Sequence, residues 1–484
     1  MTEEILNKYE MTIGIECHVQ LATDTKLFSG ANNDARGKSP NSVVSPIDYG
    51  LPGMLPILNR EAVNLAIRAG KALNAPIARV SRFDRKHYFY PDLPKGYQTT
   101  QMYNPIIEAG YIDAPLDDGS EVRVRIHHAH MEEDAGKLTH YADYSLVDLN
   151  RAGTPLIEIV SEPDIHSPQE AKAYASELHR LMTYAGVTHG DLYHGNMRFD
   201  VNISIALKGS DVLGTRAEVK NLNSFRSVEK AAEYEFQRQV SLLEKGEKVV
   251  QETRGWDDAK MVTNSQRSKE DAQDYRYMPD ADIPPIVLTD EEIEEIQAQV
   301  PMLPPAYREK WVVLEMDRSV VDSLLATREY AELIAYIQDK AGASIARRVS
   351  YWFASALGHA TDDTAVADEI KLDLTPESFI ELARMVEKNE LSSTAAKEIF
   401  LDLLTSNDSP REIAERKNLL QVSDESAIAA IVDEVLADPA SQKSLDDIKA
   451  GKEKAIGYLV GQIMKKSQGK ANPALAQKLI KERL

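Results

Sequence analysis

The sequence is poor in cysteine and contains no long hydrophobic run. Its 484 residues include one cysteine, Cys17, so an internal disulfide framework and a cysteine-rich zinc site are both excluded. No apolar run approaches the ~20 residues of a membrane-spanning helix, and the first residues lack the core of a signal peptide. We therefore expect a cytoplasmic protein without a membrane partner.

Two nucleotide-binding signatures are missing as well. The chain has neither the glycine-rich loop ending in Lys-Ser/Thr that cradles phosphates nor the Gly-x-Gly-x-x-Gly turn of dinucleotide-binding folds. Cys17 falls on the apolar side of an alternating segment, which makes it a poor nucleophile. These absences argue against P-loop enzymes, dinucleotide-dependent oxidoreductases and cysteine-nucleophile enzymes.

Negative charge dominates the chain, but unevenly. The net charge is −21 at pH 7, which by itself argues against a nucleic-acid partner. Residues 451–484 contain eight Lys or Arg and two Asp or Glu, so this segment carries +6 and the rest of the chain −27. An acidic body with a basic tail fits contact with a polyanion at one end only. The basic candidates are Lys465, Lys466 and Lys470, although exposed lysines at a solvated helix end are the usual explanation.

The pattern of turns and periodicity predicts an α+β fold in which a sheet region precedes helical ones. Strand and helix signals alternate through residues 11–290, with helices expected at 61–73, 169–185 and 227–245. After Thr289 glycine becomes rare and apolar residues recur at helical spacing, with a helical bundle at 318–405 and a linker at 406–410. The expected domains are a mixed or antiparallel sheet domain at 1–290, an all-α domain at 291–408 and a small all-α domain at 409–484.

Residues 130–137, His-Met-Glu-Glu-Asp-Ala-Gly-Lys, hold three consecutive carboxylates between a histidine and a lysine. Like charges this close repel, and each carboxylate is costly to desolvate unless it is paired or bound to a metal. The alternation at 122–126 predicts a half-buried strand, so the acidic cluster falls where a strand ends. A solvated acidic turn is the simpler alternative.

A second segment offers a metal-binding pair. Residues 13–19 alternate on a two-residue period, which places Glu16 and His18 together on the face opposite Cys17. Such a pair can hold one ion together with carboxylates from the acidic cluster and from the alternating segment 197–203, and mostly oxygen ligands suit Mg²⁺ or Mn²⁺ better than zinc. An isolated Glu-x-His pair is more often an ordinary exposed stretch of strand. The expected ligands are Glu16, His18, Glu132, Glu133 and Asp200.

Several segments carry groups suited to a charged substrate. In residues 83–98 aromatic and cationic side chains are interleaved, which suits stacking on a base or guiding an anion, although a buried aromatic cluster explains the same pattern. Arginine, lysine and amide groups elsewhere suit phosphates. The candidates for nucleotide or substrate binding are Arg151, Arg198, Asn202, Lys220, Asn223, Arg267, Tyr275 and Arg276.

These segments together resemble a known family. In order along the chain they are IGIECHVQL, FDRKHYFYPDLPKGYQ, HMEEDAGK, NRAGTPLIEIVSEPD, KNLNSF, DYRY and GKANP. Each carries modest weight alone, but the ordered set is specific. The chain resembles the GatB family, the B subunits of the tRNA-dependent amidotransferases, over essentially its whole length.

The resemblance implies a cradle-shaped N-terminal domain, a helical linker domain and a tRNA-binding tail. It implies work in a heterotrimer with an amidase partner, which hydrolyses glutamine, and with a small third subunit. The misacylating synthetase is a further implied partner. The implied substrates are Glu-tRNA(Gln) or Asp-tRNA(Asn), ATP and ammonia. A side-chain carboxylate is a poor electrophile and would first be phosphorylated, with Mg²⁺ neutralising the two anions.

The resemblance also implies residue roles. The five expected ligands match the family's metal site, and the catalytic candidates are Glu133, Lys86 and Lys95. The two lysines match positions lining the family's active site and ammonia path, where a lysine could stabilise an acyl phosphate, or pass a proton if burial lowers its pKa. Some family members bind zinc through paired cysteines near the first turn; residues 28–50 contain none, so no zinc is expected.

The sequence departs from the family pattern at three places. Residues 194–196 are His-Gly-Asn, and Met278 and Ala281 replace a usual Phe and Pro. Two alternatives to an amidotransferase subunit stay open, the first of them because of these departures. A diverged paralogue would bind tRNA or a partner without the chemistry. A metal-dependent hydrolase of nucleic acid would explain the carboxylates and the basic tail, but it leaves the aromatic and lysine segment without a role.

Overall fold

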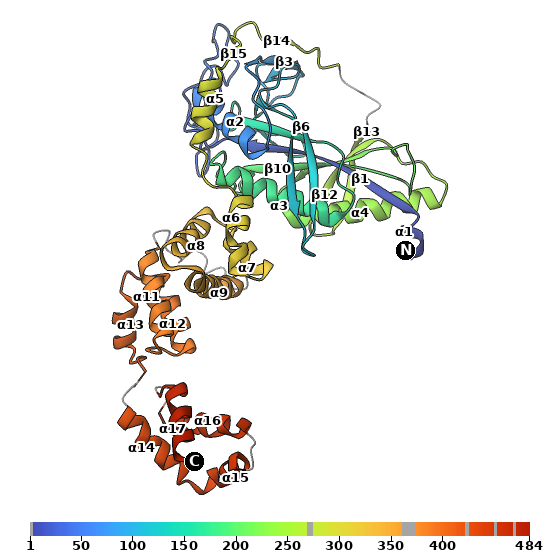
Figure 1. Ribbon diagram of the computed structural model, residues 1–484. Coiled ribbons are helices and arrows are strands. Elements are labelled where there is room, and N and C mark those ends of the chain that lie inside the picture. Colours follow the sequence, from blue (N-terminus) through green and yellow to red (C-terminus); the bar gives the residue numbers. More distant parts are fainter. Residues whose placement is uncertain (1–2, 269–273, 361–373, 422–424, 450–452, 468–470) are drawn as a thin grey trace. The chain divides into compact units, whose positions relative to one another are not determined.

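The computed structural model describes residues 3–268, 274–360, 374–421, 425–449, 453–467 and 471–484 (Figure 1). The chain divides into two compact units, residues 1–304 and residues 305–484. None of the helices formed by the described residues is both long enough and apolar enough to cross a membrane.

The first unit is built on an eight-stranded sheet with β1 (Tyr9–Gln20) near its middle. β1 pairs with β10 on one side and with β9 on the other, and neighbouring strands run antiparallel except β11 and β12, which are parallel. The order across the sheet is β13 (Val262–Ser268), β12 (Glu252–Asp257), β11 (Ala217–Leu222), β10 (Met197–Leu207), β1, β9 (Pro155–Ser161), β6 (Glu121–Glu133) and β5 (Gly110–Pro115).

The two faces of this sheet differ in chemistry. On β1 the alternate residues from Ile13 to Val19 are at most 1% exposed, as the two-residue period predicts. They belong to an apolar core shared with α3 (Pro168–Tyr184) and α4 (Phe225–Glu244), which lie along this face of the sheet (Figure 1). The residues between them, Glu16 and His18, are left on the other face.

Smaller elements gather around the end of β6. β3 (Asp84–His87), β4 (Tyr97–Thr100) and β14 (Met278–Pro279) form a three-stranded sheet, and β4 packs against β6. β7 (Lys137–His140) and β8 (Ser145–Asp148) form a hairpin shortly after β6, β2 (Val80–Ser81) pairs with β15 (Ile286–Val287), and α1 (Glu3–Leu6) precedes β1. The aromatic and cationic segment 83–98 is therefore held beside the end of β6.

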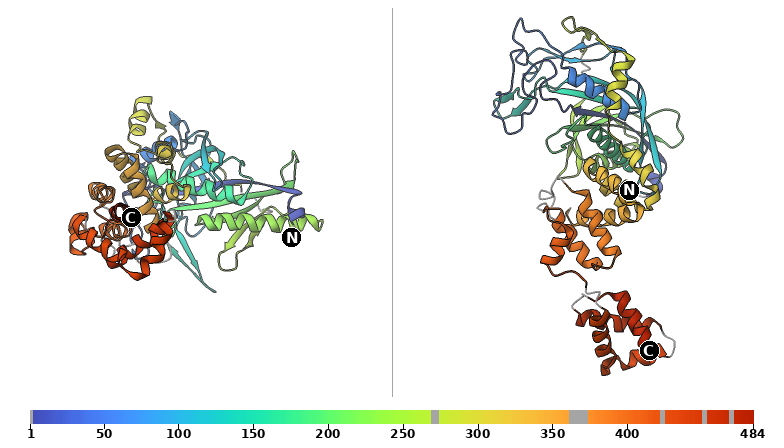
Figure 2. Two further views of the ribbon diagram at one scale, coloured as in Figure 1. Left: turned by 60° about the horizontal axis from the view of Figure 1, so that its bottom comes forward. Right: turned by 60° about the vertical axis from the view of Figure 1, so that its left-hand side comes forward.

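The described residues of the second unit are helical and include no strand (Figure 2). α14, α16 and α17 share a small core in which Val432, Leu459, Ile463 and Ile480 are fully buried. The helices are α6 (Pro304–Trp311), α7 (Arg318–Leu324), α8 (Arg328–Ala341), α9 (Ala343–Ala360), α11 (Pro376–Glu387), α12 (Ser393–Leu403), α13 (Pro410–Arg416), α14 (Glu425–Leu436), α15 (Gln442–Lys449), α16 (Ile456–Lys466) and α17 (Pro473–Arg483).

The α+β class is confirmed, and the three helices expected in the sheet region appear close to their predicted bounds as α2 (Arg60–Ala72), α3 and α4. The first unit extends past residue 290, because α5 (Asp290–Ala298) packs against α2 and its Ile296 joins the core of that unit. In the second unit α13 packs against α11 and α12. The predicted division into a linker domain and a tail domain at residue 408 stays a prediction.

Candidate metal centre

Three neighbouring strands bring histidine and carboxylate side chains together on the open face of the sheet. In the register of β1 with β9, His18 lies opposite Glu158, and in the register of β9 with β6, Glu158 lies opposite His130. Glu132 follows two residues after His130, so its side chain leaves the same side of β6. Side chains far apart in the sequence therefore meet at one place.

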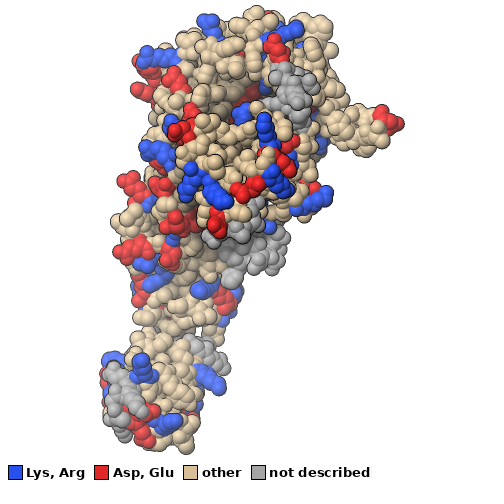
Figure 3. Space-filling model, turned by 90° about the vertical axis from the view of Figure 1, so that its right-hand side faces the viewer, with Lys and Arg blue, Asp and Glu red and all other residues tan. Residues whose placement is uncertain are grey.

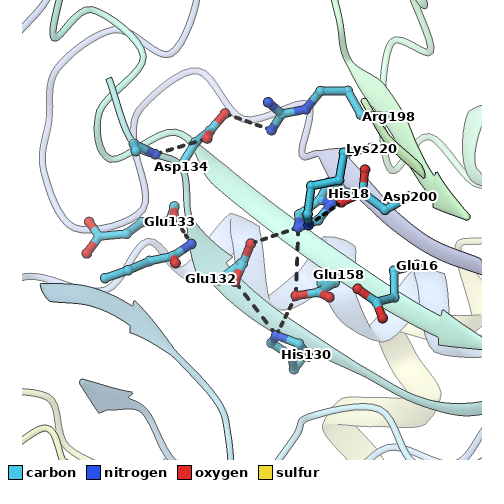
Figure 4. A network of polar contacts seen from close by, with 12 residues as sticks. Glu16, His18, His130, Glu132, Glu133, Asp134, Glu158, Arg198, Asp200 and Lys220 are labelled. Carbon is cyan, nitrogen blue, oxygen red and sulfur yellow. Dashed lines mark hydrogen bonds and ion pairs between the residues drawn. The ribbon is translucent and has the colours of Figure 1, made fainter. Parts of the chain in front are cut away.

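His18, Glu132 and Glu158, called the triad from here on, lie close enough together that they could hold a metal ion. Each offers one ligand atom, and the three atoms lie within 4.8 Å of one another. The Nε2 atom of His18 is 3.5 Å from Glu132 Oε1 and 3.8 Å from Glu158 Oε2 (Figure 4). Within the described ranges no other group of three or more such side chains comes together in this way. One imidazole and two carboxylates fit a hard divalent cation such as Mg²⁺ or Mn²⁺.

His130 contacts both carboxylates of the triad. Its Nε2 atom is 3.2 Å from Glu158 Oε2 and 3.7 Å from Glu132 Oε2 (Figure 4). Burial disfavours the charged ring, but the contacts with these two carboxylates outweigh burial and raise the pKa of His130 to about 9. His130 therefore holds both carboxylates in place from the side of β6.

Glu16 and Asp200 lie on the same face of the sheet but are engaged by protein partners. Asp200 accepts hydrogen bonds from Lys220 Nζ at 3.1 Å and from the backbone N–H of Asn221 at 2.8 Å. Glu16 accepts one from Asn202 Nδ2 at 3.1 Å, and burial is the main cause that raises its pKa. Both carboxylates border the triad, and their role as ligands stays a prediction.

Glu133 does not join the triad. The sequence predicts Glu132 and Glu133 at one ion, but both are residues of β6, so their side chains leave opposite faces of the strand. Glu133 forms an ion pair with Lys95, and its Oε1 atom accepts the backbone N–H of Thr99 at 2.9 Å. The separation arises because β6 continues through both glutamates instead of ending before them.

Lys86 interacts electrostatically with the carboxylates of the triad, whereas Lys95 is paired with Glu133. Its Nζ atom is 4.9 Å from the centre of the Tyr275 ring. Burial alone would lower the pKa of Lys86, but Glu132 and Glu158 outweigh burial, and the pKa lies above its ordinary value. Lys86 therefore offers a positive group next to the triad, and its role in stabilising an acyl phosphate or passing a proton stays a prediction.

Tyrosine rings line the space next to Lys86. β14 pairs with β3, and the backbone N–H of His87 donates to the carbonyl oxygen of Tyr275 at 2.8 Å, which brings the segment around Tyr275 against the aromatic stretch. The ring of Tyr275 lies 6.0 Å from that of Tyr88 and 6.1 Å from that of Tyr277. A charged lysine and an aromatic wall therefore stand beside the triad.

Two of the predicted arginines meet on one carboxylate. Asp134 Oδ2 is 3.0 Å from Arg198 Nη2 and 3.2 Å from Arg151 Nε. Arg198 lies opposite His18 in the register of β10 with β1, whereas Arg151 lines a cavity of about 680 Å³ next to Gln20, the last residue of β1. Asp134 thus links the surroundings of the triad to this cavity, called the polar cavity below.

The remaining predicted binding residues lie at the surface or outside the described side chains. Asn223 and Arg276 are exposed, as are Lys465 and Lys466 in the last turn of α16, where Lys466 pairs with Glu434. Lys470 and the side chain of Arg267 fall outside the described residues. On the face shown in Figure 3, Lys and Arg are interspersed with Asp and Glu, so no large block of one sign is visible there.

Glu158 is missing from the sequence-based ligand set, and His130 has no role in it. β9 reads Pro-Leu-Ile-Glu-Ile-Val-Ser, a largely buried strand in which Glu158 is the one charged residue. A lone carboxylate in an apolar strand is the signal that could have found it, since such a group has to be paired or bound to a metal. Its position opposite His18 could not be found in this way, because strand pairing is set by the tertiary fold.

Comparison with known proteins shows the family of the chain. Residues 11–294 match the GatB/GatE catalytic domain, and residues 335–484 match the GatB domain. The chain is 46% identical to the B subunit of aspartyl/glutamyl-tRNA(Asn/Gln) amidotransferase from Halorhodospira halophila, with 99% of each chain covered. It is 44% identical to the protein of the same name from Caldanaerobacter subterraneus, again with 99% of each chain covered. The chain therefore belongs to the GatB family of amidotransferase B subunits.

Proposed function

We propose that the chain activates a misacylated tRNA with ATP and amidates it. ATP would transfer a phosphoryl group to the side-chain carboxylate of Glu-tRNA(Gln) or Asp-tRNA(Asn) and leave as ADP. Ammonia would then displace phosphate from the acyl phosphate, giving Gln-tRNA(Gln) or Asn-tRNA(Asn). Both amino acids and both tRNAs stand in the names of the relatives. The observation that carries the proposal is the triad with charged Lys86 beside it.

The residues around the triad fit chemistry between two anions. Mg²⁺ held by His18, Glu132 and Glu158 would neutralise phosphate and carboxylate and hold them in line. Lys86 adds a positive group that would stabilise the negative charge of the acyl phosphate. Arg198 is aimed by Asp134 and offers a planar donor group suited to phosphate oxygens.

The Lys95–Glu133 pair suits the handling of ammonia. It lies on the opposite side of the end of β6 from Glu132, and Thr99 helps to fix the Glu133 carboxylate. Ammonia attacks only in its neutral form, and Glu133 is a carboxylate that could take a proton from an ammonium ion on this side of the strand before ammonia reaches the acyl phosphate. In this scheme a separate amidase partner hydrolyses glutamine to supply the ammonia, and a small third subunit makes the complex a heterotrimer.

The basic end of the chain fits contact with the tRNA backbone. Lys465 and Lys466 are exposed at the C-terminal end of α16, where cations also complement the helix dipole. Phosphate contacts by such lysines bind tRNA without reading its sequence. Binding of the tRNA body by the second unit would leave the sheet unit free to act on the aminoacyl end.

The test is formation of Gln-tRNA(Gln) by the complex purified with its co-expressed partners and supplied with Glu-tRNA(Gln), ATP, Mg²⁺ and glutamine. Wild type should form the product, and Glu158→Gln should lose product formation while still binding tRNA. Glu121→Gln, an exposed glutamate at the other end of β6, is the matched control and should change neither. Binding of tRNA without any product in wild type would instead support a binding module whose chemistry has been lost.

A further inference from the structure

One buried lysine has no role in the chemistry proposed above. The side chain of Lys26 is 0% exposed, and its Nζ atom lies 3.2 Å from Oδ2 of Asp48, whose side chain is 5% exposed. Desolvating two charges is costly, and when one partner of such a pair is removed, the other charge is left buried and uncompensated. The surroundings of the pair show what it holds in place.

Asp48 anchors the loop of residues 29–50, all of which the structure describes. Asn33 and Asp48 are the only buried residues of this loop. The Oδ2 atom of Asp48 accepts the backbone N–H of Ser45 at 2.9 Å and the Ser45 hydroxyl at 3.0 Å, and the Ser29 hydroxyl donates to it at 3.3 Å. Both ends of the loop are therefore tied to one carboxylate.

The end of this loop lies against the segment that carries Lys95. A Cβ added to Gly50 would lie 2.8 Å from the backbone of Pro94 and 2.9 Å from the backbone nitrogen of Lys95, so the two segments are in direct contact. The ring of Phe28, which directly precedes the loop, has its centre 5.8 Å from Lys95 Nζ, within the range of a cation–π interaction. The position of Lys95 therefore depends on where both ends of the loop are held.

The buried pair also acts on Glu133. Burial lowers the pKa of Lys26, and the negative charges of Asp48 and Glu133 act in the opposite direction. Lys26 is therefore within electrostatic reach of the carboxylate that pairs with Lys95.

The rest of the loop has anchors of its own. Residues 32–36 line the polar cavity, and the buried Asn33 donates from Nδ2 to two backbone carbonyls at 3.1 Å. Further along, Asn41 Nδ2 donates to the carbonyl oxygen of Val147 at 3.0 Å. Loss of the buried pair would therefore free the end of the loop, residues 42–50, and leave the polar cavity and the triad as they are.

We propose that Lys26 and Asp48 are positioning residues for the use of ammonia, because their ion pair holds the end of the loop against Lys95 and so keeps Lys95 and Glu133 aligned. This assignment rests on the function proposed above. Without the charge of Lys26, the Asp48 carboxylate is buried and uncompensated, and a turn of the loop toward water relieves it. That movement takes Gly50 away from Pro94 and withdraws the support of the Lys95–Glu133 pair.

The experiment uses the complex purified with its co-expressed partners, with ammonium chloride as the amido donor. Lys26→Met should raise the KM for ammonium by about 10-fold, a modest effect for a slightly displaced group at a reacting centre, and leave the KM for ATP unchanged. The double variant of Lys26→Met with Asp48→Asn removes both charges and should restore the KM of wild type. Lys38→Met changes an exposed lysine of the same loop, and this matched control should change neither KM.

Hydrogen exchange of the same complexes reports the loop itself. The backbone N–H of Ser45 is bonded to Asp48, and that of Gly50 to the carbonyl oxygen of Ile47 at 2.9 Å. Peptides that cover residues 42–50 should exchange faster in Lys26→Met and at the wild-type rate in the double variant. If Lys26→Met does not fold, Ser45→Ala carries the test. It removes one hydrogen bond to Asp48 and should raise the KM for ammonium by about 3-fold, and a wild-type KM would then overturn the assignment.

Three results with Lys26→Met would overturn the assignment. A lower kcat with both KM values unchanged would mean that the pair only stabilises the fold. Unchanged exchange of residues 42–50 would mean that the pair does not hold the loop. A wild-type KM for ammonium together with faster exchange would separate the loop from the use of ammonia. If wild type forms Gln-tRNA(Gln) and one of these results is found, only this assignment fails. If wild type forms no product, the function proposed above fails whatever the loop does.

Discussion

Although Glu132 and Glu133 are adjacent, removing the charge of one should affect a different property of the protein from removing the charge of the other. Glu132 supplies a ligand atom to the triad, whereas Glu133 pairs with Lys95 on the other side of β6. We predict that Glu132→Gln weakens Mn²⁺ binding at least ~10–100-fold, since loss of a mere outer-sphere partner already has an effect of that size. Glu133→Gln should bind Mn²⁺ as wild type does. Titration of the complex with Mn²⁺, followed by electron paramagnetic resonance, measures both.

Glu133→Gln should instead lower stability. The side chains of Lys95 and Glu133 are 12% and 5% exposed, so the substitution leaves a largely buried ammonium group without its counter-ion. Removing one partner of a buried pair destabilises a protein by about 3–5 kcal/mol, and we expect about 3 kcal/mol because the amide can still accept the N–H of Thr99. The double variant with Lys95→Met leaves no orphaned charge and should recover most of this loss. Urea unfolding of wild type, both single variants and the double variant gives the coupling energy.

Two outcomes would refute this reasoning. Equal weakening of Mn²⁺ binding by both substitutions would mean that Glu132 and Glu133 share one ion in the working enzyme. Strictly additive losses of stability from Glu133→Gln and Lys95→Met would mean that the two side chains do not act as a pair. Glu121→Gln serves as the control for both measurements, because it changes an exposed glutamate of the same strand.

Three further predictions concern other parts of the chain. Gly50→Ala should destabilise the protein by at least ~1 kcal/mol in a thermal melt. Gly50 has a φ of +67°, and an added Cβ would lie 2.8 Å from the backbone of Pro94, next to Lys95. An unchanged Tm would contradict this prediction. Burial lowers the pKa of His128 to about 4, below the ~6.5 of a histidine in an unfolded chain. As the pH falls from ~6.5 toward 4, the unfolded chain takes up a proton at His128 before the folded protein does. The free energy of unfolding is therefore highest above pH ~6.5 and decreases as the pH falls toward 4. His128→Gln should flatten that part of the stability profile in urea unfolding, and an unchanged profile would show that His128 is not its cause. Lys465→Ala should weaken tRNA binding and reduce the slope of log affinity against log salt by about 1, whereas Lys260→Ala in the first unit should change neither.

The sequence predicts what strand alternation and local composition determine. The two-residue period of β1 places Glu16 and His18 opposite the buried Cys17, and the loss of strand signals after Thr289 marks the helical part of the chain. Both features depend only on residues close together in the sequence. For the same reason the helices α2, α3 and α4 appear where their apolar spacing indicates them.

The composition of the triad could not be predicted in the same way. Glu158 reaches His18 only because β9 is the neighbour of β1 in the sheet, and strand order is a property of the whole fold. The placement of Glu133 could have been predicted from the sequence. If the alternation of β6 is continued through Glu132 and Glu133, their side chains lie on opposite faces of the strand. The pairing of Glu133 with Lys95 could not have been predicted from the sequence, because the packing of β4 and the loop before it against β6 brings the two side chains together.

The existence and make-up of the metal centre are tested most directly by anomalous scattering from crystals of the complex soaked in Mn²⁺. We predict one anomalous peak within coordination distance of His18 Nε2 and of the carboxylates of Glu132 and Glu158. A peak held by Glu133 or Asp200 without Glu158, or no peak at the triad in crystals of an active complex, would contradict the proposed centre.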